Sequence, residues 1–218
     1  GYCRGTVSHN DALVSLMLAT RDGRLGSVLP SVLIQLPGTR VSLLPGPRSH
    51  GQEASFGDLW PVLSSELQGL QRNGQDVLVD VGRLGMAFSP GPLVSAADVG
   101  VLVLRSELTA LAATRQWATE WVQAARDGSG ALSVCGLVVG EGRPYGSHDV
   151  QRTLQLPAVE SVAWDPDAAA VLSAGNPVGK KLSSSGLLKS LTGVAAAIEH
   201  RLAVARQETV TRREAVVR

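Results

Sequence analysis

The sequence predicts an α/β fold with a mostly parallel sheet and helices on both faces. Short runs rich in valine and leucine alternate with segments whose apolar residues recur at helical spacing. That alternation is typical of βαβ units. The strand-like runs are apolar at nearly every position, as expected for a sheet that is covered on both faces. Hydrophobic residues make up 44% of the chain and charged residues 18%, so a sizeable core can form and disorder is disfavoured.

The first part of the chain is predicted to contain helices at 11–19 and 56–72 and strands at 41–47 and 76–82. Asn10 or Asp11 caps the first helix, and Asn73-Gly74 ends the second, because these residue types favour helix ends. The strand at 41–47 stops at Pro-Gly-Pro, which cannot continue a central strand. Within the strand at 76–82, residues 77–81 are apolar and β-prone apart from Asp80.

The remaining chain repeats the pattern of strand and helix. Strands are predicted at 98–104, 132–140 and 159–164, and helices at 108–128, 148–155, 165–175 and 183–207. Pro166 suits the first position of a helix and Gly175 its end. We expect one α/β domain over residues 1–207 and a charged tail over 208–218.

The cysteine content favours a reducing compartment, and a cytoplasmic protein is expected. The net charge is only +1, so bulk electrostatics give no nucleic-acid signal. Cys135 lies in an apolar run and is predicted to be a buried thiol, and the only other cysteine is Cys3. Two isolated cysteines make neither a disulfide scaffold nor a zinc site. No apolar run approaches the roughly 20 residues that span a bilayer, and no signal peptide opens the chain.

Asp80 and Gly82 stand out because they follow an apolar predicted strand. Ligands of open α/β sheets bind at the carboxyl ends of strands. A carboxylate at that position, followed by a glycine, suits the Mg²⁺ and water end of a nucleotide-hydrolysing site. The alternative is an aspartate that only shapes the turn, and this short motif alone favours the alternative.

Other sequence patterns give little support for a catalytic or binding site. The segment Gly175–Lys181 resembles a phosphate loop but has one spacer too few and a lysine where a hydroxyl is needed. The four histidines are scattered without ligand spacing, so no metal site is predicted. We expect the four tryptophans to pack in the core or at its edge, and these are Trp60, Trp117, Trp121 and Trp164.

Four segments, taken together, carry a resemblance to the MinD/ParA family of P-loop ATPases. They are VLVDVGRL at 77–84, the stretch 92–118 with its Ala-Ala-Asp before a strand, GLVVGEG at 136–142, and LPAVESVAWDPDAAAVLSAGNPV at 156–178. The resemblance covers roughly residues 40–200 and depends on the order and spacing of the segments.

The resemblance implies a P-loop NTPase-like fold, ATP and Mg²⁺ as cofactors of the complete family member, and a homodimer or another protein partner. It implies a catalytic role for Asp80 and places Gly82 in the switch turn. It implies further that Gly140, Glu141 and Asp165 surround the base of the nucleotide.

The sequence departs from the family in several places. The Walker A segment is not in this sequence, so we expect the chain to be a fragment of a longer polypeptide or another segment to fill the gap. The switch segment Asp80-Val81-Gly82-Arg83 lacks the usual proline, and Glu141 stands where the family commonly has asparagine. The resemblance therefore supports the fold better than it supports ATP hydrolysis.

The leading hypothesis is a nucleotide-binding domain that acts in intracellular positioning, chromosome partitioning or apparatus assembly and is not a competent ATPase in this form. The alternative is a catalytically inert α/β scaffold that binds a protein partner. The basic, weakly amphipathic end of the last helix raises membrane contact as an option, but its interspersed glutamates favour a solvated helix.

Overall fold

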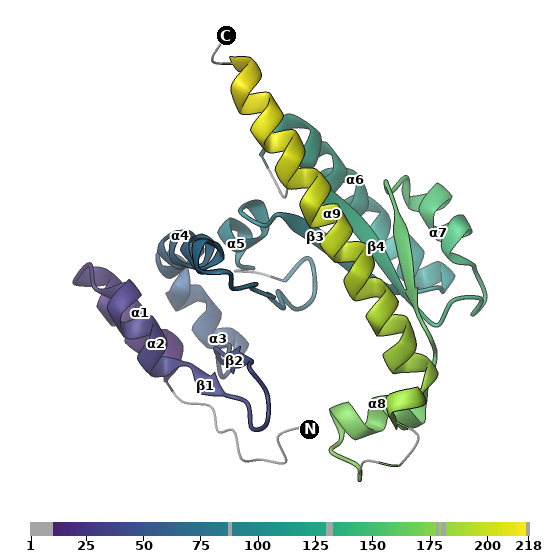
Figure 1. Cartoon of the computed structure of the whole chain (residues 1–218), viewed down its shortest axis with the longest axis horizontal. Coiled ribbons are helices and arrows are strands. Elements are labelled where there is room, and N and C mark those ends of the chain that lie inside the picture. The colour runs from purple at the N-terminus through teal and green to yellow at the C-terminus, as the bar shows by residue number, and fades with distance from the viewer. Residues whose placement is uncertain (1–10, 87–88, 130–132, 178, 180–181, 217–218) are drawn as a thin grey trace. The chain divides into compact units, whose positions relative to one another are not determined.

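A computed structural model describes residues 11–86, 89–129, 133–177, 179 and 182–216. The chain divides into two compact units, Gly1–Ala96 and Ala97–Arg218, and each is described by itself (Figure 1). Whether the two units fold as the single domain expected over 1–207 stays a prediction.

The first unit is mainly helical. Its longer helices are α1 (Ala12–Arg21), α2 (Leu25–Val32) and α4 (Leu59–Leu70), and its short elements are β1 (Ile34–Gln35), β2 (Ser42–Leu43), α3 (His50–Glu53), η1 (Ala54–Phe56), η2 (Gln71–Asn73) and α5 (Gly91–Ser95). Strands β1 and β2 pair in antiparallel register. The helices predicted at 11–19 and 56–72 are confirmed.

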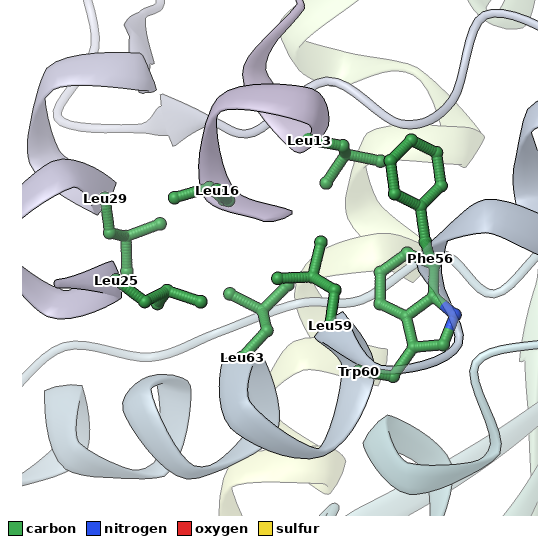
Figure 2. Packing of buried hydrophobic residues seen from close by; sticks show 8 residues of the cluster. All are labelled: Leu13, Leu16, Leu25, Leu29, Phe56, Leu59, Trp60 and Leu63. Atoms are coloured by element: carbon green, nitrogen blue, oxygen red, sulfur yellow. The ribbon is translucent and has the colours of Figure 1, made fainter. Parts of the chain in front are cut away.

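The core of this unit forms where α1, α2 and α4 pack together (Figure 2). Eight buried side chains make the cluster: Leu13, Leu16, Leu25, Leu29, Phe56, Leu59, Trp60 and Leu63. The leucines lie three or four positions apart within each helix, so they share one face. Helix α2 has no counterpart among the predictions because Pro30 lies inside it, and a proline normally marks a helix boundary.

The strand prediction for residues 76–82 is wrong. Residues 75–82 are neither strand nor helix, and Leu78 is 96% exposed. An extended segment becomes a strand only when a neighbour satisfies its backbone groups, and no strand among the described residues pairs with it. The strand predicted at 41–47 is likewise reduced to Ser42–Leu43.

The second unit contains a three-stranded parallel sheet in the order β3-β4-β5. Its strands are β3 (Val99–Arg105), β4 (Ser133–Val139) and β5 (Val159–Val162), which confirms the three strands predicted here. Leu102 of β3 aligns with Gly136 of β4, and Gly136 aligns with Val159 of β5. Cys135 is buried as predicted, and burial is the main reason that the pKa of its thiol is raised.

Helices cover both faces of this sheet, as predicted. Helices α6 (Leu108–Asp127) and α7 (Ser147–Leu154) form the two crossovers between neighbouring strands and pack on the sheet and on each other. Right-handed crossovers in one direction place both on one face. The long helix α9 (Gly186–Val216) packs against all three strands and crosses in front of β3 and β4 in Figure 1. It follows α8 (Pro166–Ser173) and η3 (Leu182–Ser184).

Ion pairs fix α9 to the sheet. Arg201 Nη2 lies 3.5 Å from Glu160 Oε1 of β5, and Arg206 Nη2 lies 3.5 Å from Asp98 Oδ2 just before β3. The helix continues to Val216, past the end predicted for it at residue 207, and the division into a domain over 1–207 and a charged tail over 208–218 stays a prediction. Within the part of the chain that the structure describes, no helix is long and apolar enough to cross a membrane.

Candidate functional site

The carboxyl ends of β3, β4 and β5 meet at one edge of the sheet, because parallel strands point the same way. A cavity of about 230 Å³ opens at this edge and is lined by Arg105, Glu107, Val139, Arg143 and Trp164. Arg105 and Val139 are the last residues of β3 and β4, and Trp164 follows β5 by two residues. This is where open α/β sheets bind their ligands.

Two guanidinium groups lie over the indole ring of Trp164. The Cζ atom of Arg105 is 5.0 Å from the ring centroid and that of Arg143 is 5.3 Å from it. Such cation–π contacts contribute about 0.5–1 kcal/mol each at exposed sites, and Trp164 is 40% exposed. The contacts orient both cations while their N–H groups remain able to donate hydrogen bonds in the guanidinium plane.

The charge balance of the cavity is positive, with two arginines against one glutamate. Arg105 Nη1 lies 3.2 Å from Glu107 Oε1, and their side chains are 57% and 48% exposed. A pair this exposed contributes at most about 1 kcal/mol. No described residue forms an ion pair with Arg143, so its charge is available to a ligand.

Ser106 determines where Arg143 lies. Its side chain is fully buried, and its Oγ donates to Gly140 O at 3.2 Å and accepts from the Arg143 N–H at 3.1 Å. Its carbonyl oxygen also accepts from the Tyr145 N–H at 3.4 Å. One serine at the end of β3 therefore holds the loop that follows β4 at three points.

Gly140 is required by both its backbone and its neighbours. Its φ is +80°, in the left-handed region that favours glycine. A Cβ atom there would lie 3.1 Å from Trp164 Cε3 and 3.4 Å from Arg143 Cδ. The residue thus allows the loop after β4 to approach the indole ring closely.

Glu141 is occupied by hydrogen bonds within the protein. Its Oε1 accepts from both the backbone N–H and the hydroxyl of Ser147, and its Oε2 accepts from Ser161 Oγ at 2.8 Å. These bonds, led by that from the Ser147 hydroxyl, lower the pKa of the Glu141 carboxyl. The carboxylate therefore joins α7 and β5 to the loop after β4.

The site residues predicted from sequence fall in different units. Gly140, Glu141 and Asp165 lie on the loops that follow β4 and β5, at the edge that carries the cavity. Asp165 caps α8, since its Oδ1 accepts from the Ala168 N–H at 3.1 Å. Asp80 and Gly82 belong to the first unit, where Asp80 Oδ1 accepts from the Gly82 N–H at 2.9 Å. That bond shapes a local turn, and the catalytic role of Asp80 stays a prediction.

None of the residues that line the cavity was predicted from the sequence to be a site residue. Trp164 was predicted to pack in the core or at its edge, but it is 40% exposed, whereas Trp60 is buried as predicted. A signal was present for three of these residues: Arg105 and Glu107 come directly after the strand predicted at 98–104, and Trp164 is the last residue of the one predicted at 159–164.

Two other kinds of site were considered in the sequence, a metal site and a phosphate loop. No group of three or more histidine, cysteine, aspartate or glutamate side chains is placed to hold a metal ion among the described residues. Within the segment 175–181, which resembles a phosphate loop, residues 178, 180 and 181 lie outside the described residues.

Comparison with protein-family models, curated proteins and solved structures found no match.

Proposed function

We propose that this chain is a nucleotide-binding α/β domain of the MinD/ParA type that holds its nucleotide at the carboxyl edge of β3, β4 and β5. In the complete family member it would act in intracellular positioning, partitioning or apparatus assembly. The observation that carries the proposal is the convergence of Arg105, Arg143 and Trp164 on one cavity.

A nucleotide is the common ligand whose chemistry matches this lining. Guanidinium groups bind phosphate oxygens through paired N–H donors. The cavity of about 230 Å³ has room for one part of a nucleotide, with the rest extending outside it. The resemblance to the MinD/ParA family implies that Gly140, Glu141 and Asp165, which lie on loops at this edge, surround the base of a nucleotide.

The lining of the cavity does not fit Mg²⁺, because it holds two cationic arginines and one carboxylate, that of Glu107. A Mg²⁺ ion needs carboxylate or phosphate oxygens that are free to coordinate it. Glu107 is paired with Arg105, and both oxygens of Glu141 accept hydrogen bonds from serines. The proposal therefore includes no metal-dependent step and no hydrolysis at this edge.

A titration of the full chain with a fluorescent ATP analogue tests the proposal. We expect saturable binding at micromolar concentration, and we expect Arg143→Gln to weaken it by on the order of tenfold or more. Arg152→Gln is the matched control, because Arg152 lies on α7 and pairs with Asp149 at 3.1 Å. Absence of saturable binding by the wild-type chain would refute the proposal.

A second candidate function, a scaffold that binds a protein partner, is favoured by one observation. Val77, Leu78 and Val79 are exposed by 42%, 96% and 44%, and exposed apolar runs mark association surfaces. A second copy of the chain is the simplest partner. Sedimentation equilibrium should then show a dimer for the wild-type chain and a monomer for Leu78→Ser. A wild-type chain that stays monomeric at high concentration would count against self-association.

A further inference from the structure

The carboxylates expected to surround a base at this edge are already engaged in holding the fold. Glu141 accepts hydrogen bonds from Ser147 and Ser161. Asp165 accepts from the Ala168 N–H and caps α8. Neither residue lines the cavity.

The indole ring is also occupied. Trp164 has two guanidinium groups over it and lies close to the backbone of Gly140. A base that took the place of either arginine on this ring would give up a cation–π contact. What the cavity offers without rearrangement is therefore a pair of oriented cations.

We propose that this cavity is a phosphate-binding site in which Arg105 and Arg143 hold a phosphate-bearing anion and no residue reads a base. The proposal rests on the proposed function and deepens it, because it assigns the phosphate end of the nucleotide to this edge. Arg143 has no acidic partner among the described residues and supplies the stronger contact. Arg105 supplies a second cation whose charge is partly neutralised by Glu107.

The phosphate groups at this site could belong to a nucleotide or to a free inorganic polyphosphate. The shared chemistry is a chain of phosphate groups with several negative charges, which two guanidinium groups can bind in bidentate fashion. Pyrophosphate is the smallest probe with that chemistry, and adenosine is the matching probe for the base. Comparing the two separates a phosphate site from a base site.

Isothermal titration calorimetry of the full chain with sodium pyrophosphate, adenosine and ATP tests the proposal. We expect pyrophosphate and ATP to bind with similar affinity, and adenosine to show no saturable heat. Affinity for pyrophosphate should fall as salt is raised, because exposed charges are screened.

Other results of the same titrations would overturn the inference. Saturable binding of adenosine, with or without pyrophosphate binding, would show that the base is read, while leaving the nucleotide-binding proposal intact. If ATP binds and pyrophosphate does not, the phosphate groups alone are not what the site recognises, and only the nucleotide-binding proposal survives. If neither ATP nor pyrophosphate binds, both proposals fail.

Two substitutions with opposite expected effects on pyrophosphate affinity test where the anion binds. Arg143→Gln should weaken pyrophosphate binding by on the order of tenfold or more. Glu107→Gln should strengthen it by about threefold, because it removes the one negative charge in the lining. Arg152→Gln serves as the control, and circular dichroism checks that each variant is folded. An unchanged affinity in folded Arg143→Gln, or a weaker one in Glu107→Gln, would contradict the placement.

Discussion

Ser106 and Gly140 act on the site through geometry and have no charge of their own to offer a ligand. The hydroxyl of Ser106 bonds to both Gly140 O and the Arg143 N–H. Gly140 leaves room for Trp164. Together they set the position of the Arg143 guanidinium over the indole ring. A ligand site of this kind depends on buried neighbours as much as on the side chains that line it.

Replacing Gly140 with alanine should destabilise the protein more than the same change at Gly128. Both residues have a positive φ, +80° at Gly140 and +78° at Gly128. A Cβ atom added at Gly140 would contact Trp164 and Arg143, whereas one added at Gly128 would have no atom within 4 Å. The left-handed conformation costs alanine about 1 kcal/mol. We expect about 1 kcal/mol for Gly128→Ala and about 2 kcal/mol or more for Gly140→Ala, measured by urea unfolding. Equal losses would show that Trp164 does not pack against residue 140.

Glu141 should make stability depend on pH. Its pKa is lowered in the folded state by the serine donors, so its stabilising contribution is present above the unfolded pKa of about 4.3. The contribution is lost as pH falls through the folded pKa. Glu141→Gln should therefore lower the free energy of unfolding at pH 7 by about 0.5 kcal/mol, a small effect because the group is exposed. The difference from wild type should shrink below pH 4, and a difference that grew there would contradict the hydrogen-bond assignment.

Single residues were the hardest part to predict from sequence. The burial of Cys135 was predicted correctly, because a small thiol flanked by apolar residues in a strand packs in the core with them. Ser106 gave no signal, since a serine after a strand is common in any loop. Arg143 lies on a loop whose path is set by Ser106, a residue 37 positions away. Local patterns cannot specify such a contact.

The elements of the two units form for different reasons. In the first unit, helices α1, α2 and α4 bury leucines at helical spacing against one another. In the second, β4 is the central strand and is paired on both sides. Residues 76–82 share the composition of β3, yet they form no strand. Composition predicts which segments can be strands, and pairing decides which of them are.

Two leucines of the first unit provide a direct test of this distinction. Leu63 on α4 is 2% exposed and Leu78 is 96% exposed. Leu63→Ala should lower the free energy of unfolding by about 2–5 kcal/mol, because it leaves a cavity in the packed cluster. Leu78→Ala should change it by no more than about 0.5 kcal/mol. Urea unfolding followed by circular dichroism measures both. A large loss for Leu78→Ala would mean that residues 76–82 are packed after all.

The fold of the whole molecule was predicted best where strand and helix alternate. From residue 97 onward every predicted element is present, and the parallel order follows from helical crossovers between successive strands. In the first unit the helices were predicted but the strands were not, because a two-residue strand such as β2 leaves no periodic pattern. The coarse class, an α/β fold with a parallel sheet, is confirmed, and the MinD/ParA type remains a proposal.

The most direct test of the nucleotide site is an NMR titration of the full ¹⁵N-labelled chain with ATP. The indole N–H resonance of Trp164, assigned with Trp164→Phe, should shift saturably, because Trp164 lines the cavity. The resonance of Trp60, which is buried in the core of the first unit, should stay unchanged and serves as the internal control. A saturable shift confined to tryptophans other than Trp164, or no shift at saturating ATP, would contradict a nucleotide site at the carboxyl edge of the sheet.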